Sequence, residues 1–147
     1  MYLRKDIVKH RFVLGLFLIA FSAILVACGG NSAPSGSQDV QVTLSEYKIT
    51  SSMNAFVPGT SYHFVVTNQG QVPHEFMIMP MGMSMQGMSM DDMHKIALTM
   101  IDNLAPGETR TIDFTFPSST SGQHLEFACH LPGHYEAGMK LPVMVNK

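Results

Sequence analysis

Four side chains with metal-binding chemistry stand out in this sequence. Cys129, His134 and Met139 follow one another as Cys-x4-His-x4-Met, and His74 lies far upstream in a segment that reads as a strand. A thiolate, two imidazoles and a thioether form the ligand set of a mononuclear blue-copper site. If all four bind the metal, no position stays open for a substrate, which argues against an enzyme.

The spacing of these residues gives the elements that must position them. Cys129 comes at the end of an expected strand, and a turn at 131–133 would bring His134 back to the same point. A second turn at 137–138 would return Met139. One short loop therefore supplies three ligands, while His74 comes from rigid sheet. Ligands held in this way resist rearrangement when the metal changes oxidation state, which favours electron transfer.

The cysteine count supports metal binding by Cys129. The chain contains two cysteines, which excludes a disulfide-dense scaffold and four-cysteine zinc or iron–sulfur sites. If Cys28 is lipidated, Cys129 has no disulfide partner in the chain, and a metal would keep it as thiolate. Zinc is a competing ion, but a thioether is a poor zinc ligand and a good copper ligand.

The first 39 residues predict export and a membrane anchor. A basic start precedes a charge-free run of 16 residues at 12–27, which is short for a membrane-spanning helix and typical of a signal peptide. The sequence Leu-Val-Ala-Cys at 25–28 resembles a bacterial lipobox. We therefore predict a signal peptide at 1–27, with lipidated Cys28 and a flexible Gly/Ser-rich tether at 28–39. The protein would be extracytoplasmic, anchored to a bacterial membrane (the cell membrane or the periplasmic side).

Residues 40–147 predict one all-β domain. Short segments of alternating or β-branched character are separated by Pro- and Gly-containing turns, a pattern that favours a sandwich. These segments are 40–44, 61–67, 74–79, 109–116, 126–130 and 141–146. One short helix is expected within 91–103, where apolar residues recur at helical spacing. His130 should point away from the metal because it follows Cys129 in a strand, and we expect it at the surface.

Methionine is concentrated in one segment. Eight of the 13 methionines fall between Met77 and Met93, and the stretch 79–90 has Pro, Gly and Ser between them, which disfavours a regular helix or a packed core. Three interpretations stay open: an adaptable loop that covers the sandwich or docks a partner, a second site for Cu(I), or an oxidation buffer. The candidate Cu(I) ligands are Met79, Met81, Met83, Met85, Met88, Met90, Met93 and His94.

From about residue 40 to the end, the sequence resembles the cupredoxins, the plastocyanin/azurin family. This resemblance implies a Greek-key β-sandwich with one copper ion on His74, Cys129, His134 and Met139. The ligand loop is similar in spacing to those of rusticyanin, auracyanin and sulfocyanin. Plastocyanin and azurin carry Asn after the first histidine ligand, where it helps to fasten the ligand loop. Glu75 occupies this position here, so the resemblance does not supply that bond.

Two functions follow as expectations. The first is a membrane-tethered blue-copper protein that carries single electrons between extracytoplasmic redox partners such as cytochromes or oxidases. The second is a Cu(I)-handling protein, a chaperone or buffer, that uses the Met-rich loop. The net charge of −2 gives no footprint for nucleic acid, and no nucleotide-binding motif occurs. We expect a monomer that meets the lipid bilayer only through acylated Cys28.

Overall fold

The computed structural model describes residues 37–83 and 87–147. The predicted signal peptide, Cys28 and most of the predicted tether lie outside these residues. The first strand begins at Gln38, so the last two residues that we assigned to the tether belong to the sheet. No helix within the described residues is long and apolar enough to cross a membrane.

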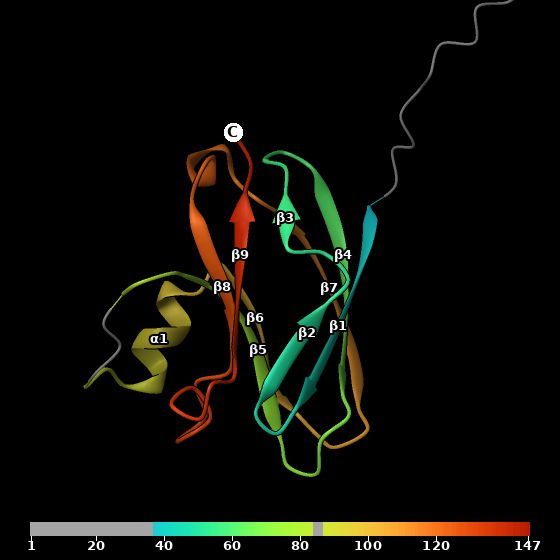
Figure 1. Ribbon diagram of the computed structural model, residues 1–147, viewed down its shortest axis with the longest axis vertical. Coiled ribbons are helices and arrows are strands. Elements are labelled where there is room, and N and C mark those ends of the chain that lie inside the picture. The colour runs from blue at the N-terminus through green and yellow to red at the C-terminus, as the bar shows by residue number, and fades with distance from the viewer. Residues whose placement is uncertain (1–36, 84–86) are drawn as a thin grey trace, which may run out of the picture. The chain divides into compact units, whose positions relative to one another are not determined.

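Two β-sheets face one another and form a sandwich (Figure 1). The first sheet has the order β2-β1-β4-β7, and the second has the order β3-β9-β8-β5-β6. The strands of the first sheet are β1 (Gln38–Ser45), β2 (Lys48–Ser51), β4 (Ser61–Asn68) and β7 (Thr109–Thr115). Those of the second are β3 (Ala55–Phe56), β5 (His74–Pro80), β6 (Thr99–Leu104), β8 (His124–Ala128) and β9 (Lys140–Val145). β1 pairs with β4, and β3 with β9, in parallel, and the other pairs are antiparallel. The predicted all-β sandwich is confirmed.

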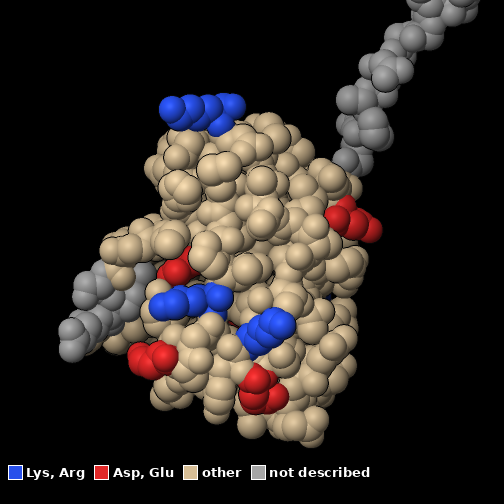
Figure 2. Space-filling model, viewed as in Figure 1, with Lys and Arg blue, Asp and Glu red and all other residues tan. Residues whose placement is uncertain are grey.

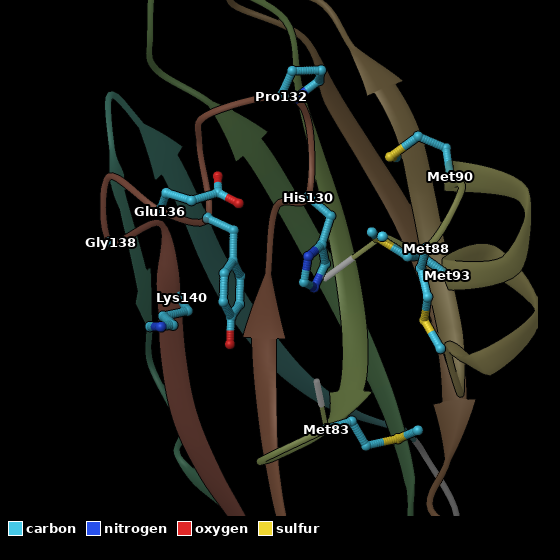
Figure 3. Close-up of a pocket in the computed structure, with 11 residues that line it drawn as sticks. Met83, Met88, Met90, Met93, His130, Pro132, Glu136, Gly138 and Lys140 are labelled. Atoms are coloured by element: carbon cyan, nitrogen blue, oxygen red, sulfur yellow. The ribbon is translucent and has the colours of Figure 1, made fainter. Parts of the chain in front are cut away.

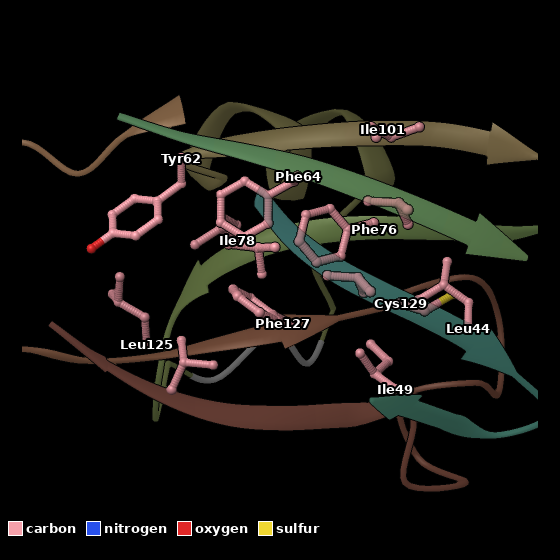
Figure 4. Packing of buried hydrophobic residues seen from close by; sticks show 14 of the residues in the cluster. Leu44, Ile49, Tyr62, Phe64, Phe76, Ile78, Ile101, Leu125, Phe127 and Cys129 are labelled. Carbon is pink, nitrogen blue, oxygen red and sulfur yellow. The ribbon is translucent and has the colours of Figure 1, made fainter. Parts of the chain in front are cut away.

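The sandwich core is formed by alternate residues of facing strands. In β4, Tyr62, Phe64 and Val66 are buried while their neighbours are exposed or half-buried, which is the period-two pattern of a strand with one covered face. Phe56 and Phe127 reach the same core from the second sheet, and both lie within 6 Å of the Phe64 ring centroid. Figure 4 shows this row of side chains, with Cys129 near Leu44 at one end of it. The core therefore extends to the cysteine that the sequence singles out.

The predicted helix is shorter than expected. Helix α1 covers Met90–Ile96, and Ser89 caps its start by accepting a hydrogen bond from the backbone N–H of Asp92. The rest of the expected 91–103 helix is wrong: residues from Thr99 onward form β6, which pairs with β5. Ile101 and Leu104 are buried in the sandwich, so sheet pairing outweighs their helical spacing.

Part of the Met-rich segment is packed, contrary to expectation. Every residue from His74 to Met79 in β5 is buried, because its two faces meet different partners. Phe76 and Ile78 face the sandwich, whereas Met77 and Met79 pack with residues of α1, including Met93. The helix therefore covers the outer face of this strand and forms a second, smaller apolar cluster.

Candidate metal centre

Three donor side chains meet at one end of the sandwich. The Nδ1 atoms of His74 and His134 are 3.2 Å apart, and the Sγ atom of Cys129 is 3.3 Å from Nδ1 of His134. All three donor atoms lie within 4.8 Å of one another. Two imidazole nitrogens and a sulfur that converge on one point can be bridged by a single metal ion. Three of the four residues predicted as ligands are therefore brought together.

The three donors come from three places in the fold. His74 is the first residue of β5, and Cys129 directly follows β8; both side chains are fully buried. His134 lies in the β8–β9 loop and is half-buried. Gly133, before it, has a φ of 83°, a conformation that side-chain-bearing residues rarely adopt. This glycine lets the loop turn so that His134 returns to the cysteine.

Met139 closes the ligand loop. Its backbone N–H donates to the carbonyl of His134 at 3.0 Å, and its own carbonyl accepts from the N–H of Cys129 at 3.1 Å. The side chain is fully buried in the core cluster that also contains Cys129. The loop thus brings the backbone of all three loop residues together, as the Cys-x4-His-x4-Met spacing predicts. Copper ligation by the thioether itself stays a prediction.

Glu46 lies beside the strand histidine and could not be identified from sequence. Its Oε1 atom accepts the backbone N–H groups of Gln71 at 2.6 Å and Val72 at 3.0 Å, and it lies 3.4 Å from Nε2 of His74. The hydrogen bond from Gln71, above all, lowers the pKa of this carboxyl. A carboxylate near Nε2 leaves Nδ1 to face His134, as metal-binding histidines require. No local signal marked Glu46, because it lies in the β1–β2 turn, far from the ligands in sequence.

Glu75 fastens the ligand loop to the sheet. Its carboxylate is almost fully buried, and Oε1 accepts the backbone N–H of His130 at 2.7 Å. The other oxygen, Oε2, lies 3.8 Å from Nε2 of His94 on α1. Burial raises the pKa of Glu75. The bond that the family resemblance assigns to Asn is therefore made here by a glutamate.

Burial acts in opposite directions on the pKa values of two of the donors. Burial lowers the pKa of His74, and the nearby His134 lowers it further, so this imidazole stays neutral with a free lone pair. Burial raises the pKa of the Cys129 thiol. The thiol therefore keeps its proton in the metal-free protein and releases it when a metal binds.

His130 is buried rather than exposed, which corrects the sequence prediction. Its side chain is 7% exposed and stacks on the Tyr135 ring, with centroids 4.4 Å apart and planes 15° apart. β8 ends at Ala128, so the side chain of His130 is not placed by strand alternation, and the loop residue Tyr135 covers it. It is nevertheless outside the group of converging donors, as predicted. Burial lowers the pKa of this imidazole.

The residues expected as Cu(I) ligands do not all lie in one place in the structure. Met83, Met88, Met90 and Met93 line one pocket together with His130. Met79 is instead buried beneath α1, Met81 is 47% exposed, and His94 faces Glu75. Met85 lies outside the described residues.

The donor set of the centre fits copper. Thiolate and imidazole are ligands that copper binds well, and the buried thioether of Met139 is available from the same loop. The buried Nε2 of His74 has no hydrogen-bond partner within the described residues, although Oε1 of Glu46 lies 3.4 Å from it, so the packing around this fully buried ring holds its orientation. The three donor atoms already lie within 4.8 Å of one another, close enough to share one ion.

This sandwich has the cupredoxin fold, which the structural neighbours identify. An auracyanin from Roseiflexus castenholzii superposes with a TM-score of 0.57, covering 76% of this chain and 100% of its own at 20% identity. The azurin Az-iso2 from Methylomonas sp. strain J also gives 0.57 over 76% of this chain and 100% of its own, at 15% identity. The fold predicted by the resemblance is confirmed.

Two curated relatives are similar in sequence. The chain is 32% identical over 108 residues to the copper-resistant cuproprotein CopI of Vibrio cholerae, an alignment that covers 68% of this chain and 60% of the relative. It is 28% identical over 145 residues to the protein of the same name in Pseudomonas aeruginosa, covering 73% of this chain and 75% of that one. The chain thus spans less than two thirds of the Vibrio relative. No protein family model matches the chain.

Proposed function

We propose that this protein binds one copper ion through His74, Cys129, His134 and Met139 and carries single electrons. One observation carries the proposal: two Nδ1 atoms and a cysteine sulfur converge at the end of a cupredoxin sandwich. The names of the two relatives, both cuproproteins, support copper as the metal. Bound copper would supply a one-electron change of oxidation state.

The contacts around the donors would hold the ligands in place when the metal changes oxidation state, which favours electron transfer. His74 is the first residue of β5, and its Nε2 lies 3.4 Å from Glu46. The β8–β9 loop is held by the hydrogen bond to Glu75 and by the two backbone hydrogen bonds of Met139. His134 is half-buried and meets the ring of exposed Tyr47 at 5.0 Å, so this edge of the centre lies near the surface. An electron-transfer partner that docks there would approach the metal through His134.

Reversible voltammetry of the copper-loaded domain tests this function. We expect an intense blue oxidised form and a one-electron wave that repeats over many cycles, because the ligands stay in place in both oxidation states. Copper content is measured before and after cycling and should not change. A colourless copper-loaded protein, or loss of copper on reduction, would contradict the proposal.

Cu(I) handling is a second candidate, supported by the pocket that gathers four methionines beside His130. The word copper-resistant in the names of both relatives also favours a role in copper handling. Rapid transfer of Cu(I) from the loaded protein to a chelating acceptor would support this function. Retention of copper through the same incubation would support the electron carrier.

We also propose that the domain works at an extracytoplasmic membrane surface, held by acylated Cys28 and meeting redox proteins such as cytochromes or oxidases. Figure 2 shows charged side chains of both signs close to one another in the lower half of one face, without a large area of a single sign, so a partner that docks on this face would not meet a surface of one charge. In a bacterial host, Cys28→Ser should move the protein from the membrane to the soluble extracytoplasmic fraction, as immunoblots of the fractions would show. An unchanged membrane fraction would contradict lipidation.

A further inference from the structure

A pocket of about 770 Å³ lies between helix α1 and the β8–β9 loop. Four methionines and one histidine line it: Met83, Met88, Met90, Met93 and His130. Figure 3 shows Met88 and Met93 across the pocket from the His130 ring, with Met90 and Met83 farther out. The pocket thus gathers soft sulfur donors around a single imidazole, and the proposed electron-transfer centre uses none of them.

The ring of His130 is stacked in place, but its Nε2 atom has no hydrogen-bond partner in the part of the chain that the structure describes. The ring stacks on Tyr135, whose hydroxyl donates to Glu126 at 2.9 Å and whose ring lies 4.0 Å from Nζ of Lys140. The Nε2 atom is buried and has no hydrogen-bond partner within residues 37–83 and 87–147. An unpaired buried nitrogen costs free energy unless a ligand meets it. The site therefore has a second feature besides methionine content that points to a bound group.

The charge of the pocket selects the kind of ion. Thioethers and a neutral imidazole carry no charge, and the charged residues of the lining, Glu136 and Lys140, have opposite signs. Such a lining does not compensate the charge of a divalent ion, and carboxylate-preferring ions find few ligands. Thioethers bind soft monovalent ions well. Methionine side chains are flexible enough to converge on an ion in a pocket of this size.

We propose that this pocket is a second metal site, which binds one Cu(I) ion through Nε2 of His130 and the sulfur atoms of Met88 and Met93. Met83 and Met90 also line the pocket, farther from the His130 ring (Figure 3). Because His130 follows Cys129 directly, the two metal sites would be joined through adjacent residues of one loop. This assignment is narrower than the ligand set expected from sequence, because Met79, Met81 and His94 are not among the residues that line the pocket.

Titration with Ag(I), a soft monovalent ion that does not change oxidation state here, tests the site. The protein is first loaded with copper, so that the centre at Cys129 is occupied, and the buffer is free of chloride. We expect one Ag(I) per protein after desalting, with the blue absorption retained. Labelled methyl groups of Met88 and Met93 should shift in NMR spectra, whereas that of exposed Met144 should not.

Matched leucine variants identify the ligands, because leucine conserves volume but lacks sulfur. Met88→Leu with Met93→Leu should weaken Ag(I) binding by more than the roughly 10–100-fold typical of losing an outer-sphere partner. Met81→Leu with Met144→Leu, at two exposed positions, should bind as the parent protein does. His130→Phe, which keeps an aromatic ring beside Tyr135, should also weaken binding.

Retained blue absorption shows that each variant is folded, so a failure here is separate from a failure of the electron-carrier proposal. Absence of Ag(I) binding to the blue parent protein would overturn the second site. Equal binding by the parent and the Met88/Met93 variant would also overturn it, as would Ag(I) uptake that only displaces copper and bleaches the colour.

Discussion

Replacing Cys129 by serine is expected to abolish the blue colour of the copper-loaded protein. The intense absorption of such a centre requires a copper–thiolate bond, and Cys129 supplies the sulfur 3.3 Å from Nδ1 of His134. Serine keeps the size of the side chain but provides a hydroxyl, which is a hard and protonated ligand. We therefore expect loss of the visible band in absorption spectra, together with weaker copper binding by competition titration.

Cys28→Ser is the matched control, because it removes the other cysteine of the chain. The protein with this change should keep both the blue colour and the copper affinity. Circular dichroism should show the same β-sheet content in the two variants. A Cys129→Ser protein that stays blue would exclude Cys129 as the thiolate ligand and with it the proposed centre.

Removing the carboxylate of Glu75 is expected to loosen the ligand loop. Glu75→Ala leaves the backbone N–H of His130 without its acceptor in a buried place, which costs about 1–3 kcal/mol of unfolding free energy. Copper affinity should fall by about 10–100-fold, the usual effect of losing an outer-sphere partner. Denaturant unfolding of the metal-free protein and copper competition measure the two effects separately.

Glu75→Gln distinguishes the hydrogen bond from the charge. Glutamine keeps an acceptor oxygen at nearly the same reach, so it should restore most of the stability and copper affinity lost in Glu75→Ala. The reduction potential should shift in Glu75→Gln if the buried carboxylate also acts on the metal through its charge. If Glu75→Ala has the same unfolding free energy and copper affinity as the parent protein, the loop is held without this hydrogen bond and the proposed role of Glu75 is wrong.

The strands with long alternating patterns could be predicted from sequence. The very short strands, and the strand β6, whose residues also suit a helix, could not. β4 alternates over eight residues, and its pattern alone identifies it. β2 and β3 are four and two residues long, too short to show a period. β6 carries buried Ile101 and Leu104 at a spacing that also suits a helix, and only its pairing with β5 decides the outcome.

The chemistry of the site was visible in sequence, but its supports were not. Residue types and spacing identify Cys129 and His134 because they belong, with Met139, to one short loop, and the residue type and strand context identify His74. Glu46 could not be found, since nothing local connects a turn residue to a distant histidine. The burial of His130 depends on how Tyr135 folds back over it, which strand alternation does not describe.

The expected ligands are split between a strand and a distant loop, so the complete donor set requires that distant parts of the chain come together. His74 and His134 are 60 positions apart, so they meet only after β5 and β8 have paired and the loop has closed. Contacts of such long range form late during folding because the chain loses much conformational freedom to close them. An ion that reaches the unfolded chain meets at most the local donors of the loop. The full set of four expected donors therefore exists only in the folded domain, so we expect the tightest metal binding from the folded apoprotein.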